Sequence, residues 1–178
     1  MAIKTINLYE LKDLSYVPTA STCDAYAEAA SVCLENQAHQ IGVEFKVEGK
    51  TVTKEIKLSW KKVSQQMIDN WNDLQEATEY GATALALLIV HKFTKYKVIK
   101  RSRKRTGIDF WLGLKEDKFP FQNRARLEIS GILKGSKSQI NQRLKTKMEQ
   151  TKQSDHLNLT AFIIVVEFSA PTAKIAIR

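Results

Sequence analysis

Residues 107–113 (GIDFWLG) and 125–131 (ARLEISG) carry the pattern from which the fold of this chain is inferred. In the first segment Ile108, Phe110 and Leu112 alternate with Asp109, Trp111 and Gly113, and in the second apolar side chains alternate with polar ones. This period of two predicts half-buried β-strands. Each segment holds one carboxylate, Asp109 or Glu128, between apolar neighbours. These two strands are the starting point for the fold and for the function.

The elements on either side of the two strands follow a simple order. Small and apolar residues recur at helical spacing over 77–89, which predicts a helix that begins near Leu74. A further strand is predicted over 96–101. Apolar residues spaced four apart predict an amphipathic helix over 138–150, and the apolar run 159–168 predicts a strand covered on both faces. From Leu74 onward the expected order is helix, three strands, helix, strand, which is an α/β fold.

The part of the chain before Leu74 is expected to be an extension of that core. Its patterns predict helices over 21–40 and 63–74 and, between them, a hairpin of strands 43–47 and 56–60. It contains no recognisable catalytic constellation. We expect this N-terminal helix and β-hairpin extension (1–73) to pack on the core (74–178), since 178 residues suit one compact domain.

Composition excludes several classes of protein. The chain is 43% hydrophobic, which is too apolar for a disordered protein. No apolar run approaches the roughly 20 residues of a membrane-spanning helix, and the first residues do not resemble a secretory signal. We therefore expect a cytoplasmic protein with no membrane contact. Cys23 and Cys33, ten residues apart in a predicted helix, are expected to be free thiols.

The positive charge is concentrated in the second half of the chain. The formal net charge is +9, and residues 92–105 hold eight basic residues and no acidic one. Such a run is either a solvated face or a surface for a polyanion such as DNA. The residues expected to contact nucleic acid are Lys100, Arg101, Arg103, Lys104, Arg105 and Arg143.

The lone carboxylates of the two strands carry the chemical signal. Burying an unpaired carboxylate is costly, so each must face water, pair with a base or bind a cation. Asp109 paired with Arg105, and Glu128 paired with Arg124 or Arg126, would be purely structural arrangements. If the two instead converge with Glu79 from the preceding helix, they form an oxygen-rich site suited to Mg²⁺ or Mn²⁺. Glu76, three residues before Glu79, competes for that third position.

A helix with Glu, a strand with Asp, a strand with Glu-x-polar, a helix and a buried strand together resemble the PD-(D/E)XK nuclease superfamily. The resemblance covers about residues 74–168 and rests on the strings EATEYGATALALL, GIDFWLG and ARLEISG. It implies a restriction-endonuclease-like fold, with Asp109 and Glu128 as metal ligands and Glu79 assisting. The family's lysine is replaced by Ser130. Arg143 and Lys147 share one face of the next helix, and Lys147 is the expected substitute.

The resemblance implies a metal-dependent DNA endonuclease, as a subunit of a bacterial defence or mobile-element system. The alternative is a catalytically inactive subunit of the same fold that binds nucleic acid or a partner protein, and Ser130 favours it. In both cases we expect a homo-oligomer or a larger complex. An assembly protein with no role on nucleic acid is a third possibility, which the net charge disfavours.

Overall fold

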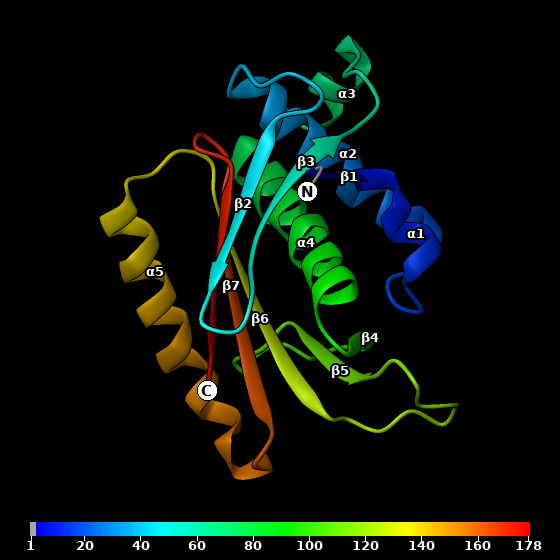
Figure 1. Cartoon of the computed structure of the whole chain (residues 1–178), viewed down its shortest axis with the longest axis vertical. Coiled ribbons are helices and arrows are strands. Elements are labelled where there is room, and N and C mark those ends of the chain that lie inside the picture. Colours follow the sequence, from blue (N-terminus) through cyan, green and yellow to red (C-terminus); the bar gives the residue numbers. More distant parts are fainter. Residues whose placement is uncertain (1–2) are drawn as a thin grey trace.

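The computed structural model describes residues 3–178 as a mixed α/β fold (Figure 1). Its strands are β1 (Lys4–Asn7), β2 (Glu44–Gly49), β3 (Thr53–Ser59), β4 (Tyr96–Arg101), β5 (Phe110–Leu114), β6 (Ala125–Ile132), β7 (Thr160–Glu167) and β8 (Thr172–Ile177). Its α-helices are α1 (Leu11–Leu14), α2 (Ala20–Asn36), α3 (Gln65–Asn70), α4 (Leu74–Phe93) and α5 (Lys137–Gln150), with 3-10 turns at Leu8–Glu10 and Thr151–Leu157.

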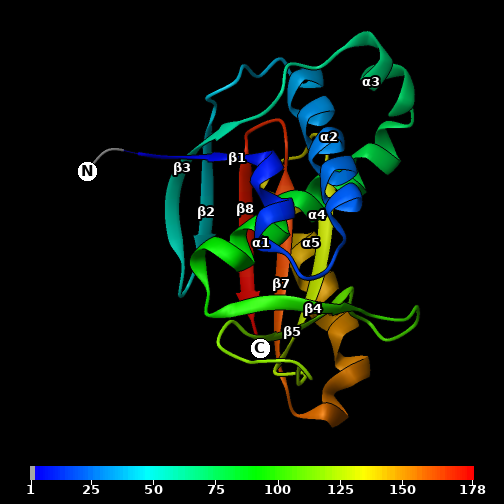
Figure 2. The same cartoon turned by 90° about the vertical axis from the view of Figure 1, so that its right-hand side faces the viewer.

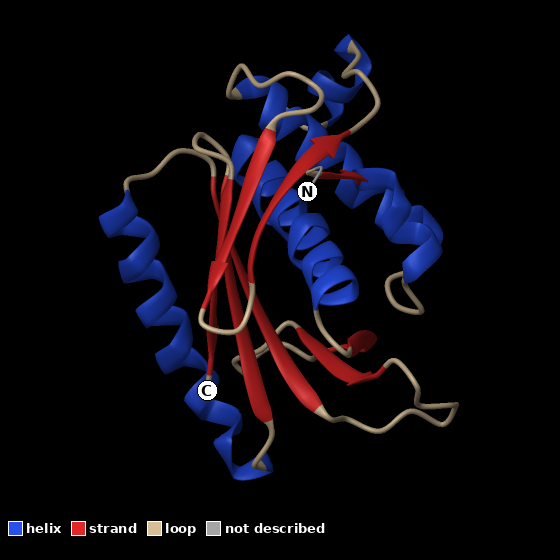
Figure 3. Ribbon diagram, in the orientation of Figure 1, coloured by secondary structure: helices blue, strands red, loops and turns tan. Residues whose placement is uncertain are grey.

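All these strands join one eight-stranded sheet in the order β1-β3-β2-β8-β7-β6-β5-β4. Helices cover both faces of this sheet, as Figure 3 shows, with α5 on one side and α4 on the other. The helix α2 packs on α4 as an outer layer (Figure 2). Because β6 and β7 are parallel, the chain needs a crossover between them, and α5 supplies it. The result is a sheet covered by helices on both faces, with β6 and β7 buried near its centre.

The close approach of α4 to β6 depends on Gly131. A Cβ atom at this position would lie 2.5 Å from the carbonyl oxygen of Thr78 and 2.9 Å from the Cβ of Ala82. The glycine therefore lets the strand lie directly against the small-residue face of the helix. Asp73 fixes where that helix begins, since its side chain accepts hydrogen bonds from the backbone N–H groups of Gln75 and Glu76.

The predicted order of elements from Leu74 onward matches the order in the structure. Helix α4 is followed by β4, β5 and β6, then by α5 and β7. The hairpin of the extension is also present as β2 and β3, and it belongs to the same sheet because β2 pairs in parallel with β8.

The structure before Leu74 differs from the predictions in the lengths of two helices and in one additional strand. The helix expected over 63–74 is only α3 (Gln65–Asn70), because the chain turns at Trp71 and restarts as α4 behind the Asp73 cap. The helix expected over 21–40 ends at Asn36, and Ala38 follows in a left-handed conformation with φ of 63°. Strand β1, which pairs in parallel with β3, was not predicted because only one of its four residues is buried.

Cys23 and Cys33 are both buried and free, as expected. Burial raises the pKa of Cys33 to about 12, so its thiol is unreactive in the folded protein. Within residues 3–178, no helix is long and apolar enough to cross a membrane.

His91 is a buried titratable group on α4 for which we predict a pH-dependent effect on stability. Burial, followed by the charges of Lys115 and Lys92, lowers the pKa of His91 to about 4. The unfolded chain takes up this proton below about pH 6.5, but the folded chain does so only below about pH 4. The free energy of unfolding should therefore fall by about 3 kcal/mol as the pH drops through this window.

Urea unfolding of wild type and His91→Gln across this window measures the effect of His91. Subtracting the two stability curves removes the contribution of every other titrating group. His156→Gln, which removes an exposed imidazole, is the matched control and should follow wild type. If wild type and His91→Gln have parallel curves from pH 7 to pH 4, the buried imidazole is not the titrating group.

Candidate active site

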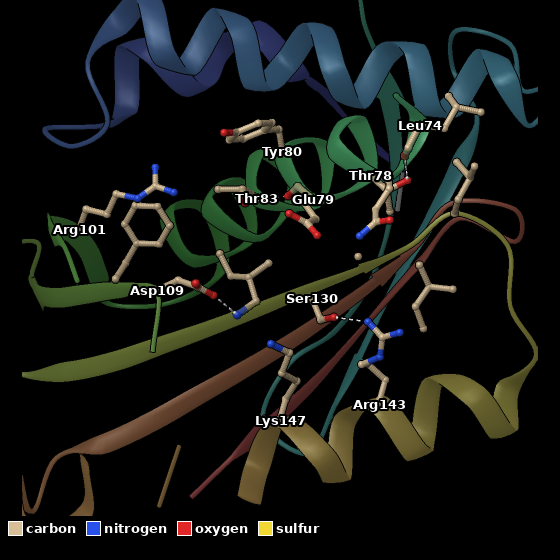
Figure 4. A pocket seen from close by; sticks show the side chains of 16 residues that line it. Leu74, Thr78, Glu79, Tyr80, Thr83, Arg101, Asp109, Ser130, Arg143 and Lys147 are labelled. Carbon is tan, nitrogen blue, oxygen red and sulfur yellow. Dashed lines mark hydrogen bonds between the residues drawn. The ribbon is translucent and has the colours of Figure 1, made fainter. Parts of the chain in front are cut away.

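The candidate site lies where β6 continues beyond its pairing with β5. These strands pair only from Phe110 to Leu112 on β5 and from Ala125 to Leu127 on β6. Beyond these pairs the β6 edge is open, and a pocket of about 650 Å³ lies there between α4 and α5. Figure 4 shows this pocket, with Thr78, Glu79 and Thr83 on the α4 side and Ser130, Arg143 and Lys147 opposite.

Asp109 and Glu128 lie side by side at the junction of the two strands. The residue pair Phe110 and Leu127 is in register, so Asp109 falls opposite Glu128 one step further along. The backbone fixes this position: the Asp109 N–H donates to the Leu127 carbonyl at 2.8 Å, and the Ile129 N–H donates to Asp109 Oδ2 at 2.8 Å. The two strand carboxylates therefore form one pair.

Burial and proximity raise the pKa of both carboxyl groups. Burial raises the pKa of Asp109 above its ordinary value, against the hydrogen bond from Ile129 and the charge of Lys147. Burial, and after it the negative charge of Asp109, raise the pKa of Glu128 to about 7. A pair of buried carboxylates of this kind is stabilised by any cation that binds between them.

One oxygen of Glu128 is held by α5 and the other is free. Oε1 accepts hydrogen bonds from Lys147 Nζ at 2.6 Å and from Gln150 Nε2 at 3.1 Å, and Lys147 Nζ also donates to Gln150 Oε1 at 3.2 Å. Oε2 is buried and has no hydrogen-bond partner in the part of the chain that the structure describes. Glu128 therefore has one buried carboxylate oxygen that no hydrogen-bond donor of residues 3–178 contacts, on the strand next to Asp109.

Gln150 is a site residue that was not predicted from the sequence. It lies three residues after Lys147 and so on the same face of α5, which was the only available signal. Its amide contacts both members of the Lys147–Glu128 pair and restrains their relative position.

Ser130 and Arg143 form a second polar pair at the pocket. Ser130 is 8% exposed, and Arg143 Nη1 donates to its hydroxyl oxygen at 2.9 Å (Figure 4). Like Lys147, Arg143 reaches the strand from α5, as their shared helix face predicts. The strand position two residues after Glu128 thus holds a hydroxyl, which Arg143 contacts from α5, while Lys147 from the same helix contacts Glu128.

Glu79 lines the same pocket from α4 but stands apart from the carboxylate pair. Its side chain is exposed, on the opposite wall from Lys147 in Figure 4. No cluster of three or more His, Cys, Asp or Glu side chains suited to a metal ion occurs within residues 3–178. Glu79 therefore does not complete a three-carboxylate site in this arrangement. Glu76, its competitor, is exposed and does not line the pocket.

Within its described residues, the structure does not contain the ion pairs of Asp109 and Glu128 with neighbouring arginines that the sequence suggested. Arg124 pairs with Asp117, and the buried Arg126 pairs with Asp155. Over residues 3–178, Glu128 pairs with Lys147 instead, and no ion pair joins Asp109 to Arg105.

The expected nucleic-acid-binding residues fall into two groups. Arg101 and Arg143 line the pocket itself. Arg101 is exposed but held in place, because Nη1 donates to the Tyr26 hydroxyl at 2.6 Å and the guanidinium lies 5.5 Å from the Phe110 ring centroid. The others, all exposed, lie at the end of β4 and in the connection to β5: Lys100, Arg103, Lys104 and Arg105.

The donor set of the pocket suits a hard divalent cation. Mg²⁺ is usually held by one or two carboxylates, with waters and substrate phosphates completing its shell. Asp109 lines the pocket and Glu128 lies opposite it on β6, with Oε2 buried, so the two supply carboxylate oxygens of this kind. Arg101 and Arg143 also line the pocket and supply positive charge for phosphate. The residues present therefore fit a magnesium or manganese ion.

Comparison with known proteins gave no significant match: no family model, no curated protein and no solved structure matches this chain.

Proposed function

We propose that this protein hydrolyses phosphodiester bonds of DNA with a divalent metal ion. The observation that carries the proposal is the adjacent pair Asp109 and Glu128 at a pocket lined by cations, with Lys147 held on Glu128. The order α4, β4, β5, β6, α5, β7 is also the one that a restriction-endonuclease-like core requires. Mg²⁺ or Mn²⁺ is the proposed cofactor.

In this proposal Asp109 and Glu128 would hold the ion, which when bound lowers the pKa of a water molecule and neutralises charge at the phosphate. Arg101 and Arg143 bind phosphate oxygens and hold the backbone of the substrate in the pocket. Lys147 donates a hydrogen bond at the carboxylate pair and takes the place of the lysine that Ser130 replaces. Glu79, on the facing wall, accepts a hydrogen bond from water entering the pocket.

A cleavage assay tests the proposal. The protein is incubated with supercoiled plasmid and with labelled oligonucleotides in Mg²⁺, in Mn²⁺ and in EDTA. We expect shortened or nicked products with either metal and intact DNA in EDTA. Inert protein in every metal condition, with and without its natural partner, would refute the proposal.

DNA binding should depend strongly on salt because of the basic residues near the pocket. We expect replacement of Lys100, Arg101, Arg103 and Lys104 together by Ala to weaken binding and to flatten the plot of log affinity against log salt. Each lost phosphate contact lowers the slope by about 0.9. Fluorescence anisotropy over a salt series measures both quantities.

The β2–β3 hairpin offers a matched control for this loss of charge. Lys46, Lys50, Lys54 and Lys57 are exposed there, and none lines the pocket. Replacing these four by Ala removes the same charge and should leave the slope close to that of wild type. Equal slopes for the two quadruple variants would show that residues 100–104 form only a solvated face.

A second candidate function is supported by one specific feature. Lys147 already forms a 2.6 Å ion pair with Glu128, and a lone hydroxyl replaces the strand lysine. An inactive subunit that keeps the fold to bind nucleic acid or a partner protein, alone or as an oligomer, would have such a site. Salt-sensitive DNA binding without cleavage in any metal condition would favour this function over the first.

A further inference from the structure

Three aromatic rings lie in a row beside the candidate active site. Tyr80 of α4 stacks on Tyr26 of α2, with ring centroids 5.3 Å apart and planes 18° from parallel. Trp71 meets the Tyr80 ring edge-on, at 5.6 Å and 62°. Tyr26 is buried, but Tyr80 and Trp71 keep part of their surface exposed. The row thus has a rigid base on α2 and exposed aromatic surface above it.

This row of rings is continuous with the carboxylate pocket. A shallow groove of about 450 Å³ runs over the rings and is lined by Tyr26, Trp71, Tyr80 and Arg101. Tyr80 and Arg101 also line the pocket that contains Asp109. In Figure 4 the Tyr80 ring and the Arg101 guanidinium lie on the same side of the pocket. A chain of nucleotides with one phosphate at Asp109 therefore has an aromatic surface within reach of its next bases.

Arg101 connects the two regions chemically. Its guanidinium is held by the Tyr26 hydroxyl and by the Phe110 ring, and within residues 3–178 its other N–H groups have no hydrogen-bond acceptor and can meet a ligand. Alternating cations and aromatic rings are the chemistry that binds single-stranded nucleic acid, since phosphates take the cations and exposed bases stack on the rings. In a duplex the base faces are covered by their neighbours, so these rings could not reach them.

We propose that Tyr80 and Trp71 form a binding subsite for an unpaired nucleobase, and that the substrate is accordingly single-stranded DNA or the unpaired part of a branched or frayed DNA. This inference rests on the proposed function for the position of the scissile phosphate at Asp109 and Glu128. The base stacks on the Tyr80–Trp71 surface while Arg101 holds the intervening phosphate.

A second group of aromatic residues serves as an internal control. Tyr16 and Phe119 are 57% and 76% exposed and surround Phe121, but none of the three lines the pocket or the groove. Tyr16→Leu therefore removes an exposed aromatic ring and leaves the residues of the proposed subsite unchanged.

Binding is measured by fluorescence anisotropy in EDTA, where metal-dependent cleavage does not occur, with oligothymidylate and with a duplex as the two probes. We expect wild type to prefer the single strand. Tyr80→Leu should weaken its binding at least about fivefold and leave duplex binding unchanged. Tyr80→Phe, which keeps the ring, and Tyr16→Leu should bind the single strand within about twofold of wild type. Thermal unfolding of each variant verifies that it is folded.

A second measurement needs no variant. Oligothymidylate carrying 5-iododeoxyuridine is crosslinked to wild-type protein by light, and the modified peptide is identified by mass spectrometry. We expect the crosslink at Tyr80 or Trp71. Crosslinks only at Tyr16, Phe119 or Phe121, equal affinity for both probes, or equal losses in Tyr80→Leu and Tyr16→Leu would overturn the inference.

These outcomes are separate from those of the cleavage assay. A protein that cuts duplex DNA in Mg²⁺ without any dependence on Tyr80 keeps the proposed function and loses the base subsite. A protein that never cuts but binds single strands through Tyr80 keeps the subsite and loses the proposed function.

Discussion

Asp109→Asn and Glu128→Gln are each expected to lower DNA cleavage at least about a hundredfold, because even the outer partners of metal ligands commonly contribute 10- to 100-fold. Both substitutions keep the shape of the side chain and remove the charge that would hold the cation in the proposed function. DNA binding should stay unchanged or tighten, since affinity comes mainly from the basic surface and one negative charge is lost. Initial rates on a labelled oligonucleotide, with anisotropy in parallel, separate the two effects.

The control for these variants is Glu76→Gln, an exposed carboxylate of α4 that does not line the pocket. It should cut like wild type, and the two carboxylate variants, purified in parallel with it, control for contaminating nuclease. Lys147→Ala, like the two carboxylate variants, should cut DNA more slowly than wild type, because it removes the cation that contacts Glu128. Cleavage by both carboxylate variants at the wild-type rate would mean that the activity does not reside at this pair.

Gly131→Ala is expected to destabilise the fold by about 2–3 kcal/mol, the upper part of the range for overpacking a core. The new methyl group would lie 2.5 Å from the Thr78 carbonyl oxygen, a backbone atom that can move only if α4 or β6 shifts. The same shift would disturb Ser130 and Glu128, which lie on this strand. Urea unfolding measures the stability change.

Gly113→Ala is the matched control because it makes the same change in the neighbouring strand β5. There the nearest atoms are the γ2 methyl group of Ile99, at 3.0 Å, and the Gln122 carbonyl oxygen, at 3.3 Å, so the new methyl group is less crowded than at Gly131. Gly113→Ala should lower the free energy of unfolding by less than about 1 kcal/mol. Equal stability losses in the two variants would indicate that the close packing of α4 on β6 is not what Gly131 provides.

The strands that carry the site could be predicted from the sequence because their alternation is strong. Asp109 and Glu128 each interrupt an apolar pattern, and residues 115–123, which contain Asp117 and Pro120 and suit a loop, connect the two strands. The cross-strand position of the two acids follows from the pairing of these strands. Lys147 and Arg143 could be placed on one helix face by their spacing of four.

The remaining features depend on tertiary packing and leave no local pattern. A helix can be predicted around Glu79, but the rotation of α4 about its axis decides whether that side chain meets Asp109, and here it stays on the facing wall. Gln150 acquires its role only because α5 crosses β6 at the level of Glu128. The row of Tyr26, Tyr80 and Trp71 unites α2, α4 and the turn before α4, which no short sequence window contains.

A crystal of this protein soaked in Mn²⁺ would test the central claim most directly. The proposed function predicts an anomalous difference peak between Asp109 and Glu128, about 2–2.5 Å from a carboxylate oxygen of each. It also predicts that the peak is absent from Asp109→Asn crystals treated in the same way. A wild-type structure without this peak at saturating Mn²⁺, with Lys147 Nζ still seated on Glu128, would contradict the claim.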